Sequence, residues 1–474
     1  MDQHLIKSIY VEKLFGLYTY DFDNDKLNNS AVIFYGDNGV GKSTLLRLAF
    51  HLLSPSNSRG HRTALIKTNF QLLKVELTSG YILTARPNLT KNEPNVMVLD
   101  IIKDDVIIAR WNHRPDAAGS RRMIIDDDDV IYFNDDEVIY LNDREAFEYL
   151  PGRLKKNQKK DPLRKVTSQK LYLEILKKIA PITFILNADR RLDGDTISNP
   201  DDEVELRQVV RMGTPKRIQD LVLRSREIAL SQALSAATKW IARKAVQGTN
   251  QGTDNVHSTY VRILKQLVST SNKDETTFQD NDIDTLKSNL KKIGSETFSL
   301  AKYELTSFLE MSEFEKILST ASKSERVLSA ELLKPYIESL DGRLEGVRTI
   351  YQILDRFIST INGLLTDKEI RFQLSQGFQI INKFGDVLQP AQLSSGEQQL
   401  LLLFCYVLVA RDTPSIFMID EPEISLNIKW QRIIINSLLD ITDGANIQFI
   451  FASHSLEIIS QHRNRVIKLE NKNA

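Results

Sequence analysis

The sequence predicts an α/β fold in which both ends of the chain build one mixed or parallel sheet domain, with a β-subdomain and an inserted, mainly helical domain. An apolar run at 31–35 stops at Gly36, and apolar residues then recur at helical spacing over 42–53. The last hundred residues alternate between helical and strand patterns, which is typical of a parallel sheet. Between these ends, residues from about 205 to 365 carry many helical patterns and few strand patterns.

The composition is that of a folded protein without disulfides. The chain has 474 residues, of which 42% are hydrophobic and 26% charged, and this length allows about two to three domains. Its one cysteine, Cys405, excludes an internal disulfide framework and any zinc or iron–sulfur site built from several cysteines. No apolar run reaches the length of about 18 residues that a membrane span needs, and the polar N-terminus lacks the pattern of a secretion signal. We therefore expect a cytoplasmic protein.

The net charge is zero, with 62 basic and 62 acidic residues, which argues against a cationic coat over the whole chain for binding nucleic acid. Charge is nevertheless unevenly distributed, because residues 126–137 are strongly acidic and residues 153–170 strongly basic. Such runs are most often solvated loops or helix faces. As functional alternatives, the acidic run would be an edge that docks a partner, and the basic run would contact a phosphate backbone.

The N-terminal part is predicted to consist mainly of strands. Residues 6–15 and 18–22 are rich in β-branched and aromatic residues, and the helix predicted over 42–53 ends before Pro55. Further strands are predicted at 72–77, 81–85, 96–102, 106–111, 130–133 and 182–186. A β-subdomain is the simplest explanation for the runs between 70 and 140.

The remaining elements complete the predicted domain organisation. Helices are expected at 217–246, 259–268, 299–320 and 329–365, with mobile linkers at 248–255 and 271–284. Strands are expected at 369–374, 378–384, 415–419 and 448–452, and further helices at 397–410 and 429–440. We therefore predict a sheet domain made of residues 1–200 and 366–474, and an inserted helical domain at 201–365.

A glycine-rich segment between an apolar strand and a helix matches the P-loop pattern, G-x4-G-K-[ST]. It consists of Gly36, Asp37, Asn38, Gly39, Val40, Gly41, Lys42 and Ser43, and Thr44 follows it in the helix. The glycines let backbone N–H groups point at a phosphate, assisted by the positive end of the helix dipole. Lys42 would bridge the β- and γ-phosphates, and the Ser43 hydroxyl would bind Mg²⁺. The segment therefore predicts a nucleotide-binding site.

Two carboxylates end an apolar strand near the C-terminus. The run 415–419 leads directly into Asp420 and Glu421. Because the carboxyl ends of parallel strands meet at one crevice, we expect these acids beside the P-loop. Asp420 would hold the shell of a magnesium ion, and Glu421 would accept a proton from the attacking water. Taken alone, the pair could equally be an acidic turn at a strand end.

A third segment opens a helix and consists of Ser394, Ser395, Gly396 and Glu397. Ser394 or Ser395 is expected to cap this helix, and its N-terminus offers a second site for an anion. On its own, the stretch could be only a capped helix. Together with the P-loop and the acidic strand end, it resembles the signature sequence of ABC-type ATPases.

Further residues extend the resemblance to ABC-type ATPases. His454 follows the apolar run 448–452, as the switch histidine of that family does. About 350 residues separate the P-loop from the signature, which resembles the RecF/SMC/OLD-like branch of the family rather than transporter subunits. The family's glutamine at the end of the strand entering the helical part corresponds to Asn187 here. Asn187, or Asp189 near it, could then serve as a further Mg²⁺ ligand.

The resemblance implies an ATPase with ATP and Mg²⁺ as cofactors and Lys42, Glu421 and His454 as its catalytic residues. It also implies that two copies pair head to tail and trap each ATP between one copy's P-loop and the other's helix at Ser394, with Ser395, Gly396 and Glu397 also in contact with the nucleotide. Hydrolysis would then set the shape of the homo-oligomer.

Within this branch, the layout is similar to the ATPase subunits of bacterial anti-phage systems of the Septu type. That similarity predicts a sensor or regulator that acts through ATP-driven dimerisation and controls a partner nuclease. A RecF-like repair ATPase is the first alternative, and it would bind duplex DNA through the basic run 153–170. A peripheral energy subunit of a transporter is the second, and the large helical insert disfavours it.

Overall fold

The computed structural model describes residues 5–27, 29–57, 59–88, 96–114, 167–188, 192–195, 226–248, 280–320, 323–424 and 426–472. Four predicted features lie outside these ranges: the strand at 130–133, the helix at 259–268, the acidic run 126–137, and residues 153–166 of the basic run. The chain divides into two compact units, one of Met1–Leu221 with Ala410–Ala474 and the other of Val222–Val409.

The first unit contains a six-stranded antiparallel sheet in the order β2-β1-β4-β5-β6-β7. Its strands are β1 (Ile6–Leu14), β2 (Tyr18–Phe22), β4 (Leu72–Leu77), β5 (Tyr81–Pro87), β6 (Met97–Lys103) and β7 (Val106–His113). Buried side chains alternate along β4, where Leu73, Val75 and Leu77 face the core. This sheet confirms the predicted β-subdomain.

A second six-stranded sheet forms the core of the same unit, in the order β15-β3-β14-β13-β8-β9. Its strands are β3 (Ala31–Tyr35), β8 (Ile182–Leu186), β9 (Leu192–Gly194), β13 (Ser415–Asp420), β14 (Ile447–Ala452) and β15 (Val466–Lys468). All pairs are parallel except β8 with β9. Every residue of β13 and β14 is buried, as expected of a parallel sheet covered on both faces. The predicted α/β fold class is confirmed.

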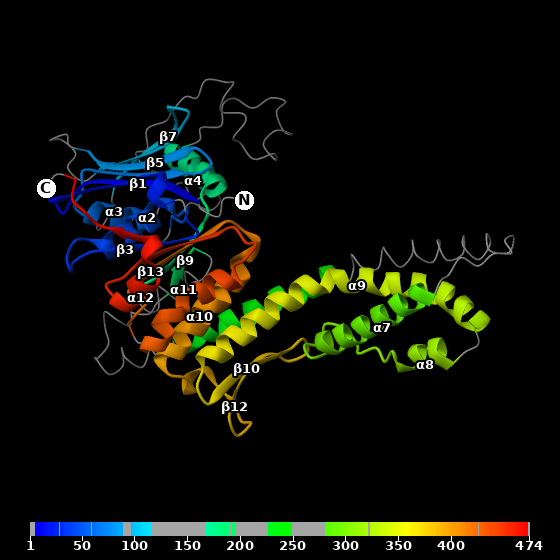
Figure 1. The fold of residues 1–474 in the computed structure, drawn as a ribbon. Helices are drawn as coiled ribbons and strands as arrows, with labels where there is room; N and C mark the ends of the chain where they lie inside the picture. The colour runs from blue at the N-terminus through cyan, green and yellow to red at the C-terminus, as the bar shows by residue number, and fades with distance from the viewer. Residues whose placement is uncertain are drawn as a thin grey trace, which may run out of the picture. The chain divides into compact units, whose positions relative to one another are not determined.

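Helix α2 (Lys42–Leu53) lies between the two sheets (Figure 1). Its leucines are buried against strands of both sheets, so one hydrophobic core holds the P-loop helix and both sheets together. The other helices of this unit are α1 (Asn24–Leu27), α3 (His61–Lys67), α4 (Ser168–Ile179), α11 (Ile428–Ile441) and α12 (Leu456–Gln461), with single 3-10 turns η3 (Ala410–Asp412) and η4 (Arg463–Arg465). Helix α4 packs against β7 at the edge of the antiparallel sheet.

The second unit is mainly helical. Its helices are the stretch 226–248, α7 (Asp280–Ala301), α8 (Ser312–Thr320), α9 (Lys323–Leu364) and α10 (Ser395–Val409). A small antiparallel sheet follows α9 and consists of β10 (Lys368–Gln373), β11 (Gly377–Asn382) and β12 (Val387–Leu388), before the 3-10 turn η2 (Pro390–Gln392). Helices α7, α8 and α10 all pack against α9. Strand β10 also packs against α9, and these contacts explain why residues 366–409 group with the helices, whereas the sequence places them in the sheet domain.

One predicted helix and part of one predicted linker are wrong. Residues 299–320 do not form a single helix, because α7 ends at Ala301 and α8 begins at Ser312. Helix α7 also begins at Asp280, inside the linker predicted at 271–284.

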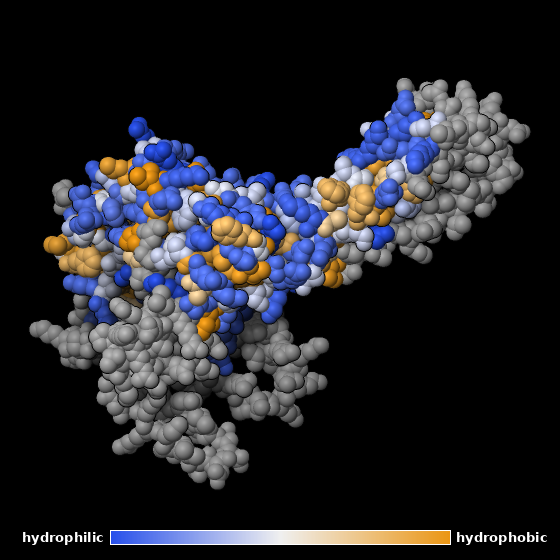
Figure 2. Space-filling model, turned by 90° about the horizontal axis from the view of Figure 1, so that it is seen from below, coloured by the Kyte–Doolittle hydropathy of each residue, from blue (hydrophilic) through white to orange (hydrophobic). Residues whose placement is uncertain are grey.

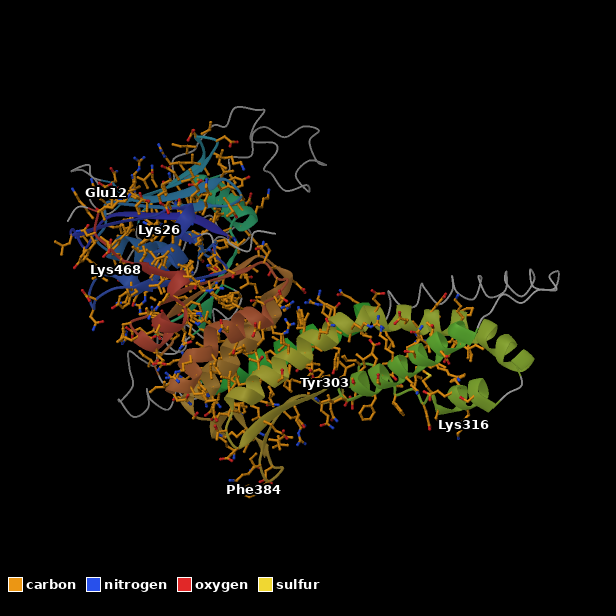
Figure 3. The ribbon with its side chains drawn as sticks, in the orientation of Figure 1. Glu12, Lys26, Tyr303, Lys316, Phe384 and Lys468 are labelled. Atoms are coloured by element: carbon orange, nitrogen blue, oxygen red, sulfur yellow. The ribbon has the colours of Figure 1, made fainter. Side chains whose placement is uncertain are left out.

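Contacts from distant parts of the unit cause this break in the helix. Glu304 has a φ of 58°, a left-handed conformation that ends a helix. The hydroxyl of Tyr303, labelled in Figure 3, donates a hydrogen bond to Asp355 of α9 at 2.6 Å. The Tyr303 carbonyl accepts from the backbone N–H of Leu374, just after β10, at 3.3 Å. These contacts override the helical periodicity of the segment.

The described surface carries both polar and apolar side chains (Figure 2). On the face shown in Figure 2, hydrophilic side chains are interspersed with apolar patches. Among the apolar side chains, Phe384 is 79% exposed, at the turn between β11 and β12 (Figure 3). Within the described part of the chain, no helix combines the length and apolar character needed to cross a bilayer.

Candidate nucleotide-binding site

The core sheet aligns four strand ends that carry the predicted site residues. In register, Phe34 of β3 lies beside Ala452 of β14, Ala452 beside Asp420 of β13, and Ile419 beside Leu186 of β8. The residues that follow these strands therefore lie along one edge of the sheet. They are the P-loop after β3, His454 after β14, Glu421 after β13 and Asn187 after β8.

The P-loop curls around its own lysine. Gly39 and Gly41 have φ angles of 87° and 93°, the left-handed region that favours glycine. A Cβ at Gly41 would also lie 2.7 Å from the side chain of Leu14, so a glycine is required there. The buried Lys42 ammonium donates to the carbonyl oxygens of Gly36 at 2.7 Å and Asp37 at 2.9 Å. These bonds use two of the three N–H donors of the ammonium group, and the third can donate to a phosphate oxygen.

Ser43 and Asp420 form the contact between the P-loop and β13. The Ser43 hydroxyl donates to Oδ1 of Asp420 at 2.7 Å, and Asp420 is only 1% exposed. The other oxygen, Oδ2, is buried and accepts no hydrogen bond from any described residue, and the Arg47 guanidinium lies 3.6 Å from it. Burial raises the pKa of Asp420 above its usual value, although the Ser43 hydrogen bond acts in the opposite direction. A hydroxyl and a carboxylate with an unsatisfied oxygen are hard donors that fit Mg²⁺.

Glu421 and His454 face each other across β13 and β14. Glu421 has a φ of 50°, which is unusual for any residue other than glycine, and its backbone N–H donates to the carbonyl of Ala452 at 2.8 Å. Nδ1 of His454 lies 3.9 Å from Oε1 of Glu421. Strained backbone of this kind persists where the surrounding structure holds it, often at functional sites.

Glu423 holds the histidine, a function that the sequence did not indicate. One of its carboxylate oxygens, Oε1, accepts from the backbone N–H of His454 at 2.9 Å and lies 3.1 Å from Nδ1 of the same residue. The other oxygen accepts from the Ser453 hydroxyl at 2.9 Å. The signal in the sequence is the second acid of Glu-Pro-Glu, but its partners lie 30 residues away.

The predicted ligand Asn187 lies next to Asp420 along the sheet edge. Its amide nitrogen donates to Oδ2 of Asp193 in β9 at 2.8 Å. Because a carboxylate only accepts hydrogen bonds, Asp193 fixes the amide orientation and leaves the Asn187 carbonyl oxygen as the candidate ligand. That role stays a prediction, and Asp189 lies outside the described residues.

An aromatic side chain beside the P-loop was missed by sequence reasoning. Phe15 follows β1, has a φ of 58° and donates its backbone N–H to the carbonyl of Asn69 at 2.7 Å. Its ring lies 3.2 Å from the position that a Cβ at Gly41 would occupy, and the residue is 41% exposed. An exposed phenylalanine against a phosphate-binding loop is suited to stacking on a base. Its position depends on the irregular end of β1, which strand periodicity does not reveal.

The signature segment belongs to the second unit, and its N-cap prediction is confirmed for Ser394. The Ser394 hydroxyl accepts from the backbone N–H of Glu397 at 3.4 Å, and the Ser394 N–H donates to Oε2 of Glu397 at 2.7 Å, which together form a capping box. The Lys368 ammonium donates to both Glu397 oxygens, at 2.8 and 3.0 Å. The first unit thus brings together Lys42, Ser43, Asp420, Glu421, His454 and Asn187, whereas Ser394, Ser395, Gly396 and Glu397 lie in the second. Their roles toward a nucleotide stay predictions.

Comparison with known proteins adds a family. Residues 224–460, half of the chain, match the family model described as "AAA domain, putative AbiEii toxin, Type IV TA system". An 82-residue stretch is 37% identical to the molybdenum import ATP-binding protein ModC of Escherichia coli K12 and to that of Shigella flexneri. It covers 17% of this chain and 22% of ModC, so the chain spans about a fifth of the length of these relatives.

Solved structures of Smc head domains also resemble the chain. The head from Pyrococcus furiosus, with an extended coiled coil and bound to the C-terminal domain of ScpA, is 12% identical with a TM-score of 0.34, covering 98% of this chain and 94% of that one. The head from Pyrococcus yayanosii, with a coiled coil and joint, is 14% identical with a TM-score of 0.34, covering 96% and 93%.

Proposed function

The chain belongs to the AAA-domain family whose model it matches, and from this premise we propose that it binds and hydrolyses ATP at the sheet edge described above. The observation that carries the proposal is the 2.7 Å hydrogen bond between Ser43 and Asp420, beside the P-loop wrapped around Lys42. It joins a phosphate-binding loop to an acidic strand end, the two parts that ATP hydrolysis at a P-loop requires.

Each side chain of the site has a part in the proposed reaction. Lys42 neutralises charge between the β- and γ-phosphates, and Glu421 accepts a proton from the attacking water. His454, oriented by Glu423, contacts the γ-phosphate or that water. Ser43 and Asp420, with the Asn187 carbonyl, would hold Mg²⁺, which supplies charge neutralisation at the transferred phosphoryl group.

Two copies complete the proposed catalytic assembly. The N-terminus of α10 presents backbone N–H groups and the Ser394 hydroxyl, which suit an anion that already has other ligands. In the proposed head-to-tail dimer, this helix end of one copy contacts the triphosphate held by the P-loop of the other. ATP then favours the dimer because its γ-phosphate contacts both copies, and hydrolysis removes that link.

The test is the variant Glu421→Gln, which keeps the shape of the side chain but removes the base. It is expected to bind ATP as the native protein does, to lower turnover at least about a hundredfold, and to accumulate as an ATP-dependent dimer in sedimentation. Lys42→Ala is the control, because it removes the phosphate contact and is expected to abolish both binding and dimer formation. Native turnover in Glu421→Gln would show that the base is assigned wrongly.

The biological role that we propose is control of a partner nuclease in anti-phage defence. The layout that resembles ATPase subunits of the Septu type supports it, and the family model that matches is described as a putative toxin of a toxin–antitoxin system. Purification from the native host is then expected to yield a second polypeptide with nuclease activity. Direct binding to duplex DNA, as by a RecF-like repair ATPase, is the alternative that the basic run 153–170 supports. Salt-dependent DNA binding by the purified chain alone would favour that alternative.

A further inference from the structure

We propose that Lys368 is a positioning residue through which the end of helix α9 sets the geometry of the signature serine, Ser394. The inference rests on the proposed function, because it concerns the helix end that would contact the triphosphate of a second copy. Three consecutive sets of contacts, all within the second unit, carry it.

The first set joins α9 to β10. The Asn362 amide, in the last turn of the 42-residue helix, donates to the carbonyl of Ile370 at 3.1 Å, and its oxygen accepts from the Ile370 N–H at 2.7 Å. Ile370 is fully buried, and the helix ends at Leu364, only a few residues before β10 begins at Lys368. Because one side chain satisfies both backbone polar groups of a buried residue, α9 and β10 are expected to move together.

The second set joins β10 to the signature segment. The Lys368 ammonium donates to Oε1 and Oε2 of Glu397 at 2.8 and 3.0 Å, with side chains that are 24% and 7% exposed. Burial alone would raise the pKa of Glu397, but the hydrogen bonds from Lys368 and Ser394 outweigh it and hold that pKa below its usual value. A carboxylate buried this deeply requires a cationic partner, and the structure provides Lys368.

The third set joins Glu397 to Ser394. Oε2 of Glu397, which Lys368 already contacts, also accepts from the Ser394 N–H at 2.7 Å, and the Glu397 N–H donates to the Ser394 hydroxyl at 3.4 Å. One carboxylate therefore connects the lysine to both the backbone and the hydroxyl of the serine. A displacement of β10 moves Lys368, reorients Glu397 and changes the position of Ser394.

This arrangement makes the ATP site of a partner copy sensitive to the conformation of the helical unit. Whatever shifts the C-terminal end of α9 changes how Ser394 meets the triphosphate across the dimer. The P-loop belongs to the other unit, so binding of ATP to a single copy does not depend on Lys368. The inference therefore separates two measurements: the affinity of one copy for ATP, and the turnover of the assembled dimer.

The test compares Lys368→Met with the matched control Lys383→Gln in full-length protein. Lys383 lies just after β11 on the same sheet, and its ion pair with Asp367 is exposed. We expect Lys368→Met to bind ATP within about twofold of native and to lower kcat about tenfold or more, with Lys383→Gln unchanged. Lys368→Arg, which keeps the charge, is expected to recover most of the turnover. Asn362→Ala should also lower kcat, and its effect should be smaller when it is added to Lys368→Met, because both break one path.

Two further variants keep the result interpretable. Lys368→Met leaves Glu397 without its cationic partner, which could prevent folding. In that case the double variant Lys368→Met with Glu397→Gln removes both charges. It keeps the capping box, because glutamine also serves at this position. Native turnover in that folded double variant would overturn the inference. Ser394→Arg blocks the helix end itself. If it abolishes turnover while Lys368→Met is as active as native, the inference fails and the proposed function stands. If Ser394→Arg is fully active, the inference and the proposed two-copy assembly both fail, while ATP hydrolysis at the P-loop stands.

Discussion

At the scale of single residues, the side chain of Phe15 offers a direct prediction about nucleotide binding. Its backbone lies in the left-handed region, and its ring touches the P-loop at Gly41. Stacking of an aromatic ring on a base contributes about 1–3 kcal/mol. Phe15→Ala is therefore expected to raise the Kd for ATP by about fivefold to about 150-fold in equilibrium titration.

Leu17→Ala provides the matched control for Phe15→Ala. Leu17 is 66% exposed in the same turn, so its removal tests the loss of an exposed apolar side chain without loss of the ring. Phe15→Trp should retain the affinity because it keeps an aromatic face. An unchanged Kd in Phe15→Ala would place the base elsewhere.

A pair of adjacent histidines, of which His61 is buried and His51 partly buried, leads to a prediction about pH. Nδ1 of His51, near the end of α2, lies 2.9 Å from Nδ1 of His61, whose Nε2 lies 3.3 Å from Asp195. Burial, together with the neighbouring His61, Arg47 and Arg62, lowers the pKa of His51 to about 3. The P-loop helix therefore carries a histidine that stays neutral in the folded protein at ordinary pH.

The consequence is a loss of stability as the pH falls. Between pH 6.5, the value of an ordinary histidine, and about 3, the unfolded chain binds a proton at His51 that the folded chain does not. The free energy of unfolding therefore decreases by up to about 1.4 kcal/mol per pH unit within that window. His51→Gln keeps a hydrogen-bonding side chain that does not titrate. Between about pH 7.5 and about pH 5.5, this variant should lose about 1.4 kcal/mol less of its free energy of unfolding than the native protein does. Equal losses in denaturant unfolding of the two proteins would contradict this assignment.

The sequence predicts the residues of the candidate site whose conformations are set locally, and misses those positioned by distant contacts. The P-loop, Asp420, Glu421 and the cap at Ser394 follow from short patterns, because their neighbours in sequence determine their conformations. Glu423, Asp193 and Phe15 could not be predicted in the same way. Each depends on a partner elsewhere in the chain, such as Ser453, Asn187 or the P-loop, that only the fold brings near.

At the scale of elements, the crossing between the helical stretch 226–248 and α9 depends on two glycines. A Cβ at Gly346 would lie 2.2 Å from the carbonyl oxygen of Gly248, and this backbone atom cannot move aside as a flexible side chain could. Gly346→Ala is therefore expected to destabilise the helical unit by about 1–3 kcal/mol, because the helices must separate. Denaturant unfolding monitored by circular dichroism measures this change.

Gly363 supplies the matched control on the same helix. A Cβ there meets no atom within 4 Å, so Gly363→Ala adds the same methyl group without a clash. It should be neutral or stabilise the protein by up to about 1 kcal/mol, because alanine loses less backbone entropy in a helix. A Gly346→Ala protein as stable as Gly363→Ala would show that the two helices do not cross this closely.

The elements themselves were predicted with unequal success, for a physical reason. Several elements have the bounds that the sequence predicts, because burial on one or both faces sets their hydrophobic patterns. They are the strands 18–22, 31–35, 72–77 and 182–186 and the helix 42–53. The break between α7 and α8 was missed because Tyr303 is held by α9 and by the residue after β10. Helical periodicity continues through that break and carries no sign of it.

At the scale of the whole molecule, the two ends of the chain meet in one sheet, and the signature helix groups with the inserted helices. The sequence indicates the first of these facts through its alternating pattern. It does not indicate the second, because the contacts of α10 with α9 have no local signature. The unit that carries Ser394 is therefore distinct from the unit that carries Lys42, and the proposed head-to-tail dimer uses one of each at every ATP.

A mixing experiment tests this use of two units from two copies. Lys42→Ala disables the P-loop of its own chain and leaves its signature helix intact, whereas Ser394→Arg does the reverse. In either variant alone, no pair of copies can form an intact ATP site, because every copy carries the same defect. In a mixed dimer, one site combines both defects, but the other combines an intact P-loop with an intact signature helix.

If Lys42→Ala and Ser394→Arg pair at random when they are mixed in equal amounts, half of the dimers are mixed, and each mixed dimer has one intact site that can bind ATP. Turnover should therefore rise from near zero to about a quarter of the native value if the two sites act independently. The measurement is phosphate release against the mixing ratio, with a maximum expected at equal amounts. The opposite outcome is a mixture that is as inactive as its components, although sedimentation shows that mixed dimers form. An intact composite site would then be present without turnover. The signature helix of one copy would therefore not serve the P-loop of the other.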